Sequence, residues 1–168
     1  MKTAEKIGSV KDLNGLKEKT LQNKKTKAAN KEILLCAGAG CIASGALELK
    51  AALQNALDNA GMEVPITETG CLGPCAKGPV IIVKPDNVFY EDVSKDDAQD
   101  IVSLHLLEGT VVDRLVHKNM EDGKAAPKQE DIDFFSGQTK IVLRNCGRID
   151  PLDIEDYIAE GGYQALAK

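Results

Sequence analysis

Two pairs of cysteines, each set in a glycine-rich loop, constrain this chain more than any other feature. Cys36 and Cys41 enclose the residues AGAG, and Cys71 and Cys75 enclose LGP within the stretch GCLGPCAKGP. Glycine permits a positive φ and close approach of the main chain to a bound group, while proline fixes φ and removes an amide donor. The second stretch therefore predicts a shaped loop and disfavours a helix or a central strand.

The chain from residue 32 to residue 61 predicts a buried strand followed by a helix. The apolar run EILLCAG ends at a glycine and predicts a strand that carries Cys36 to its tip. Apolar residues then recur along one face over residues 42–60, which predicts a helix that ends at Gly61. We expect this helix to cover a sheet.

Three further strands and a second helix are expected before residue 109. The stretch MEVPITET predicts a strand over residues 62–69, and Pro65 places it at an edge of the sheet. The runs PVIIVKP and NVFYEDV flank a Pro-Asp-Asn turn and predict an antiparallel hairpin. A Ser-x-x-Asp pattern, typical of a capping box, begins a helix over residues 94–107. The order of these elements predicts an α/β domain with a mixed sheet of about four strands and flanking helices.

The two ends of the chain differ from this domain in charge and composition. Residues 1–32 contain nine Lys and four acidic residues, whereas the whole chain has a net charge of −5. A thin apolar stripe within residues 1–30 predicts a basic, exposed helix, whose charge is either a solvated face or a docking surface for an acidic partner. Residues 119–133 predict a polar linker, and residues 134–168 a short C-terminal strand and helix that are too small for a core of their own.

The overall composition excludes several classes of function. An acidic chain offers no support for nucleic-acid binding as its main task. No apolar run is long enough to cross a bilayer and no apolar signal segment begins the chain, so we expect a cytoplasmic protein without membrane insertion. Thiols stay reduced in the cytoplasm, and an odd number of cysteines, five, fits a disulfide framework poorly.

The two cysteine loops are expected at the same end of the sheet, because they flank a strand–helix–strand unit. Four thiolates can converge there, which supports a four-cysteine metal site. An iron–sulfur cluster and a structural zinc ion both fit this ligand count. A thiol–disulfide enzyme remains a third alternative, although the chain lacks a Cys-x-x-Cys pair. Four buried cysteines that bind nothing are the fourth.

Glycines in the loops favour the cluster over zinc. They are Gly38 and Gly40 in the first loop, and Gly73 and Gly78 in the second. Glycine lets backbone amides approach inorganic and cysteinyl sulfur, and such hydrogen bonds tune the potential of a cluster. A zinc site has less use for them.

The stretch CAGAGC followed by GCLGPCAKGP resembles the motif of the thioredoxin-like 2Fe-2S ferredoxins. This family includes the smaller peripheral-arm subunit of bacterial complex I and domains of NAD(P)-linked iron hydrogenases. The resemblance implies a thioredoxin-like ferredoxin domain over residues 31–118. It also implies a 2Fe-2S cluster in which Cys36 and Cys41 ligate one iron, and Cys71 and Cys75 the other.

The tail, IVLRNCGRIDPLDIEDYIAEGGYQAL, is similar to the opening of the FMN- and NADH-binding subunit of complex I, in the form found in the flavoprotein subunit of electron-bifurcating hydrogenases. Residues 134–168 are accordingly expected to begin a flavoprotein-type module. FMN and NAD(P) would then bind only in a longer chain or a partner subunit, because this sequence ends without a further glycine-rich loop. The resemblance implies flavoprotein and other iron–sulfur subunits as partners.

Other polar residues are expected to play smaller parts. His105 is interpreted as a core histidine, His117 as solvated and Cys146 as an inert thiol outside the site. Lys77 lies inside the cluster loop, where its charge either raises the potential or faces water. No residue is a convincing general acid, base or nucleophile. The sequence therefore predicts one-electron transfer by a module of an NAD(P)H-linked oxidoreductase or hydrogenase, with a zinc-stabilised interaction module as the alternative.

Overall fold

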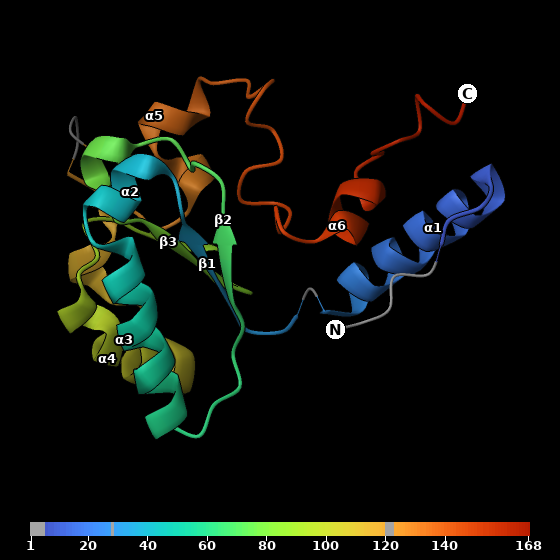
Figure 1. Ribbon diagram of the computed structural model, residues 1–168. Helices are drawn as coiled ribbons and strands as arrows, with labels where there is room; N and C mark the ends of the chain where they lie inside the picture. Colours follow the sequence, from blue (N-terminus) through green and yellow to red (C-terminus); the bar gives the residue numbers. More distant parts are fainter. Residues whose placement is uncertain (1–5, 28, 120–122) are drawn as a thin grey trace. The chain divides into compact units, whose positions relative to one another are not determined.

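Figure 1 shows the computed structural model of the chain, which describes residues 6–27, 29–119 and 123–168. The chain divides into two compact units: residues 30–148, which we call the sheet domain, and residues 1–29 with 149–168, which we call the terminal unit. Residues 1–5 and 28 of the expected basic arm, and 120–122 of the expected linker, lie outside the described residues.

In chain order the elements are α1 (Val10–Lys27), β1 (Glu32–Cys36), α2 (Ala39–Ala43), α3 (Ala46–Asn59), β2 (Ile66–Thr69), η1 (Cys75–Lys77), β3 (Ile81–Lys84), β4 (Val88–Tyr90), η2 (Lys95–Asp97), α4 (Ala98–Asp100), η3 (Ile101–Leu107), η4 (Asp113–Leu115), β5 (His117–Lys118), β6 (Ala125–Ala126), η5 (Gln129–Asp131), α5 (Asp133–Ser136) and α6 (Ile154–Ala159).

The main sheet has the strand order β2-β1-β3-β4. Strand β1 runs parallel to β2, with Cys36 opposite Thr69, and antiparallel to β3, with Leu35 opposite Ile81. Strands β3 and β4 form the expected antiparallel hairpin. Strand β2 begins directly after Pro65 and lies at the edge, where a residue without an amide donor is tolerated. The mixed four-stranded α/β fold is confirmed.

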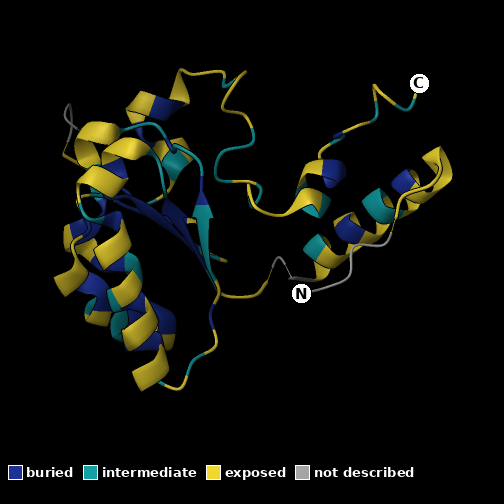
Figure 2. Cartoon of the chain, in the orientation of Figure 1, coloured by how far each residue is buried: buried dark blue, intermediate teal, exposed yellow. Residues whose placement is uncertain are grey.

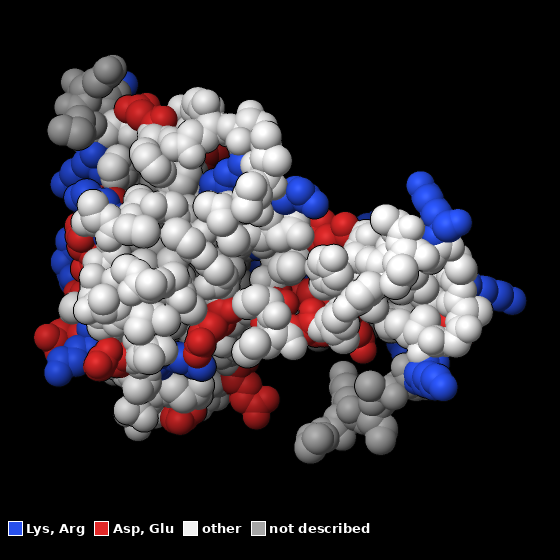
Figure 3. All heavy atoms as spheres, turned by 45° about the horizontal axis from the view of Figure 1, so that its top comes forward, with Lys and Arg blue, Asp and Glu red and all other residues white. Residues whose placement is uncertain are grey.

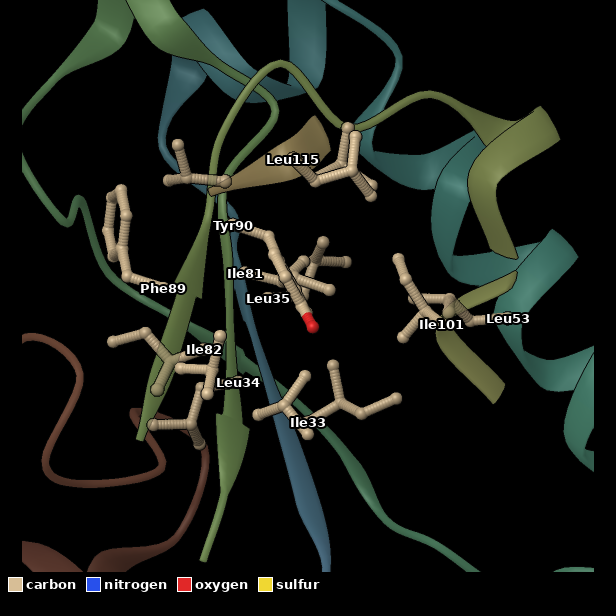
Figure 4. Packing of buried hydrophobic residues seen from close by; sticks show 14 of the residues in the cluster. Ile33, Leu34, Leu35, Leu53, Ile81, Ile82, Phe89, Tyr90, Ile101 and Leu115 are labelled. Atoms are coloured by element: carbon tan, nitrogen blue, oxygen red, sulfur yellow. The ribbon is translucent and has the colours of Figure 1, made fainter. Parts of the chain in front are cut away.

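Successive side chains of the strands point to opposite faces of the sheet, as the pleat requires. Figure 4 shows Tyr90 on the face that carries Leu53 of α3 and Ile101 of η3, and Phe89 on the other face. Figure 2 shows β1, β3 and β4 as a largely buried layer, whereas the edge strand β2 is mostly of intermediate burial. Because both faces are covered, β1, β3 and β4 are mainly apolar runs that do not alternate with polar residues.

The two predicted helices form, each with a change in geometry. A break at Gly45, which has φ 99°, divides the first into α2 and α3. The capping box of the second is confirmed, since the backbone amide and the hydroxyl of Ser94 each donate to Asp97 Oδ2 over 2.7 Å. The helix then widens to π geometry in η3 and ends before Gly109, which has φ 73°.

The segment that follows β5 packs on the sheet domain over the residues that the structure describes. The amide of Phe89 in β4 donates to the carbonyl of Pro127 over 2.6 Å. Ala126, Ile132 and Phe135 are buried. The sheet domain therefore extends to residue 148, beyond the boundary expected from polar composition, because a few apolar residues suffice to seat this segment. That residues 134–168 begin a flavoprotein-type module stays a prediction.

The C-terminal segment corrects one expectation. No strand forms within residues 137–168, all of which the structure describes; Ile141 and Val142 are 71% and 91% exposed and have no neighbouring strand to pair with. The expected helix does form, as α6, and it contacts α1 within the terminal unit. There Lys24 Nζ lies 3.0 Å from Asp156 Oδ2.

The helices of the described chain are too short or too polar to cross a membrane.

Candidate metal centre

The first cysteine pair lies in the interior of the sheet domain. Strand β1 carries Cys36 to its end, where the Cys36 amide donates to the carbonyl of Val80 over 3.1 Å. Helix α2 then turns the chain back and places Cys41 beside it. The two side chains are 1% and 2% exposed.

The second pair lies in the loop between β2 and β3, nearer the surface. The Sγ atoms of Cys71 and Cys75 are 3.9 Å apart; Cys71 is half-buried and Cys75 exposed. Gly73 lies between them with φ 124°, a conformation that L side chains rarely adopt, as its sequence context predicted. The Cys75 amide donates to the Gly73 carbonyl over 2.9 Å, which closes the turn.

Three other glycines bring the two pairs together. A Cβ on Gly38 would lie 3.3 Å from Cys71 Cβ, and one on Gly40 would lie 3.3 Å from Cys75 Cβ. On Gly78 it would lie only 2.8 Å from Cys41 Sγ. The predicted loop glycines are therefore positions of close approach, and the structure places all four predicted ligand cysteines in one region.

The sulfur atoms are arranged as two pairs. Among the described residues, no three His, Cys, Asp or Glu side chains are grouped as they would be around a single metal ion. A 2Fe-2S cluster takes four cysteine ligands, two on each iron, so two adjacent pairs in a cradle of glycines fit this cofactor.

Burial disfavours the thiolate form at this site. It raises the pKa of Cys41 to about 12, and the hydrogen bond with the Cys36 thiol acts in the same direction. Burial also raises the pKa of Cys71, and this outweighs the opposing effect of a hydrogen bond from the Gly73 backbone. Metal binding must therefore release protons from these cysteines, because the thiolate is the ligand.

Lys77, in the same loop as Cys75, has its charge balanced locally. Its Nζ lies 3.3 Å from Asp92 Oδ2 and 3.4 Å from Glu91 Oε1. The hydrogen bond with Asp92 and the charge of Glu91 raise the pKa of Lys77. Two carboxylates thus offset the one cation of the loop.

The two histidines lie apart from the cysteines. His105 is a core residue, as expected: it is 4% exposed, and its Nδ1 lies 2.8 Å from the hydroxyl of Tyr90. The expectation that His117 is solvated was wrong. His117 begins strand β5 and is half-buried, with its Nδ1 2.8 Å from Glu91 Oε2.

Cys146 is the residue whose position the sequence did not reveal. Its Sγ is 2.8 Å from the place where a Cβ on Gly70 would lie, so it packs against the residue before Cys71. No spacing rule links a cysteine so far along the chain to this loop. Gly70, directly before Cys71, and Gly147, directly after Cys146, were the only sequence signs of this close approach.

The chain matches the family model for thioredoxin-like [2Fe-2S] ferredoxins over residues 21–105. A 2Fe-2S ferredoxin of Clostridium pasteurianum is 36% identical over 77 residues, which are 45% of this chain and 76% of that protein. The crystal structure of the thioredoxin-like [2Fe-2S] ferredoxin of Aquifex aeolicus is similar, with 32% identity, a TM-score of 0.48 and coverage of 53% of this chain and 97% of that one.

A third similarity is short. The NADP-reducing hydrogenase subunit HndC of Solidesulfovibrio fructosivorans is 61% identical over 31 residues, which are 18% of this chain and 6% of that protein. The family match covers half of the chain and includes both cysteine pairs. With two pairs of thiols held in glycine loops at one end of a mixed sheet, this chain belongs to the thioredoxin-like 2Fe-2S ferredoxins, electron-transfer proteins whose cofactor is a 2Fe-2S cluster.

Proposed function

We propose that Cys36 and Cys41 hold one iron and that Cys71 and Cys75 hold the other. The arrangement of the four thiols as two adjacent pairs carries this assignment. Because the first pair is buried and Cys75 is exposed, electrons are exchanged with a partner at the side of the second pair. When bound, the cluster accepts and returns one electron at a time.

The chain works, in this proposal, as a module of an NAD(P)H-linked oxidoreductase or hydrogenase. The short similarity to a subunit of an NADP-reducing hydrogenase supports this, as does the resemblance of the tail to a flavoprotein subunit. A flavin is needed between NAD(P)H and the cluster, because NAD(P)H gives up two electrons as a hydride and the cluster takes one electron at a time. The flavin and the nicotinamide bind in a longer form of the chain or in a partner subunit, next to other iron–sulfur subunits.

One face of the sheet domain suits a protein partner. Figure 3, which brings the top of Figure 1 forward, shows mostly uncharged atoms over the face of the sheet domain in view, with charged side chains toward its margins. Interfaces between proteins are depleted of charged residues at their centres. This face of the sheet domain can therefore approach a redox partner without desolvating many charges.

Four alanine variants, one at each proposed ligand, test the ligand assignment. Each leaves one iron with a single protein ligand, so iron content and the visible spectrum of the anaerobically purified chain should be lost or converted. Cys146→Ala is the matched control and should keep the parent's iron content. Two or more ligand variants with the parent's iron content and spectrum would refute the assignment.

The link to NAD(P)H is tested with the oxidised holo chain under anaerobic conditions. NADPH or NADH alone should leave the visible absorption unchanged, whereas addition of ferredoxin–NADP reductase as an external flavoprotein should bleach it. Equal bleaching without the flavoprotein would contradict the proposed role of a flavin. Failure of the flavoprotein to reduce a cluster that dithionite reduces would contradict the NAD(P)H link itself.

A further inference from the structure

A segment from the C-terminal part of the sheet domain crosses the face of the sheet on which Phe89 lies. We call residues 134–147 the strap; it begins in α5 and ends at Gly147. Phe135 packs edge-on against Phe89 of β4, with ring centroids 5.7 Å apart. Together with Leu34 and Ile82 of the sheet, strap residues line a cavity of about 580 Å³, which places the strap over this face.

Hydrogen bonds join the strap to the chain around the second cysteine pair. The amide of Gly147 donates to the hydroxyl oxygen of Thr69 over 2.6 Å, and Lys140 Nζ donates to the carbonyl of Leu72 over 3.4 Å. Thr69 is 1% exposed and lies two residues before Cys71. The strap therefore fixes backbone and side-chain groups on both sides of a proposed ligand.

Close packing adds to these hydrogen bonds. A Cβ on Gly70 would lie 2.8 Å from Cys146 Sγ, and one on Gly147 would lie 2.8 Å from Leu72 Cδ2. One on Gly73 would lie 3.2 Å from Phe135 Cε1. The loop residues before and between Cys71 and Cys75 thus contact the strap in succession.

We propose that the strap is a positioning element for the second cysteine pair and shields the cluster from water at Cys71, whereas Cys75 stays exposed. This inference rests on the proposed ligand assignment. A four-thiolate 2Fe-2S cluster becomes more negative when reduced, and water stabilises the more highly charged state. Shielding by the strap therefore keeps the reduction potential lower than a loosely held loop would give.

The pair Gly70 and Cys146 allows a sharp test, because a methyl group on one meets the sulfur of the other. Gly70→Ala should push the strap away from the loop, lower the melting temperature and raise the reduction potential. Removing the sulfur in the double variant Gly70→Ala/Cys146→Ala should restore both toward the values of Cys146→Ala alone. Gly137→Ala is the matched control, since its Cβ would meet nothing within 4 Å; it should match the parent.

Amide hydrogen exchange on the apo chain gives a readout that does not depend on the cluster. Exchange of the amides of residues 70–73 should be faster in Gly70→Ala and return to the parent's rate in the double variant. The strap proposal would be overturned if Gly70→Ala left melting temperature, reduction potential and exchange rates unchanged. It would also be overturned if Gly70→Ala changed them and the added Cys146→Ala substitution did not reverse the change. Failure of the proposed function is a different result: the parent itself would have the wrong metal content.

Thr69 provides an independent test of the hydrogen bond. Thr69→Val removes the acceptor of the Gly147 amide with little change of shape, and Thr69→Ser retains it. We expect Thr69→Val to raise the potential and to speed exchange of the Gly147 amide, and Thr69→Ser to restore both. Equal potentials and equal exchange in all three proteins would also contradict the proposal.

Discussion

The two cysteine pairs of this protein are held in different ways. Cys36 and Cys41 come from β1 and α2 and are fixed by the core of the sheet domain, whereas Cys71 and Cys75 lie in a loop between strands. The first pair thus depends on the packing of nearby elements, and the second on backbone conformation and on residues far along the chain. One site thus combines a half that is anchored in the core with a half that distant parts of the chain must hold in place.

The largest effect is expected from overpacking the first pair. A methyl group at the half-buried Gly78 would lie 2.8 Å from the Sγ atom of the buried Cys41, so neighbouring atoms would have to shift. Gly78→Ala should cost about 1–3 kcal/mol of folding free energy, as overpacked cores do, and lower the yield of holo protein. Urea unfolding and iron analysis measure the two effects. A variant as stable and as iron-rich as the parent would show that the first pair is not held by the core.

Backbone strain at the second pair should have a similar or smaller cost. Gly73 has φ 124°, and a β-branched residue there costs about 1–3 kcal/mol. Gly73→Val should therefore destabilise the loop and shift the reduction potential, with Gly137→Ala as a control in open space. If holo-protein yield, melting temperature and potential all match those of the parent, the loop does not require this conformation.

Acid should weaken the core of the sheet domain at His105, away from the cysteine pairs. Burial lowers the pKa of His105 below its ordinary value of 6.5, although the carboxylate of Asp86 opposes this. The unfolded chain therefore binds a proton that the folded chain does not, and stability is lost as the pH falls below about 6.5. Melting temperatures between pH 7.5 and pH 5.5 should fall in the parent and fall less in His105→Gln. Parallel pH profiles would contradict this account.

The smallest effect is expected at Lys77. Its side chain is 47% exposed and its charge is balanced by Glu91 and Asp92, and exposed ion pairs contribute about 0–1 kcal/mol. Lys77→Gln should change melting temperature and reduction potential less than Thr69→Val does. A larger shift of potential in Lys77→Gln would mean that loop charge, and not the strap, sets the environment of the second pair.

Local sequence signals predicted much of the fold. The apolar run of β1, Pro65 before the edge strand β2 and the capping box at Ser94 are each decided by neighbouring residues, and each is confirmed. The break at Gly45 was missed because apolar spacing continues across it. The short C-terminal strand does not form, since no strand that the structure describes lies beside Ile141 and Val142.

The site was predictable to the extent that its parts are close in sequence. Paired spacings and loop glycines identified four cysteines that the structure does bring together. The contribution of the strap could not be predicted, because contacts such as Gly147 with Thr69 join distant residues through packing. The polar composition of residues 119–133 concealed how that segment packs on the sheet domain. His117, just before this segment, was for the same reason expected in solvent, although it pairs with Glu91.

The metal, sulfide and electron content of the anaerobically purified full chain decides whether the two cysteine pairs hold a 2Fe-2S cluster. A 2Fe-2S cluster held by the two cysteine pairs predicts a coloured protein with about two iron atoms and two acid-labile sulfide ions per chain. A redox titration should then show uptake of about one electron. A colourless protein with about one zinc ion per chain and no sulfide would contradict the account.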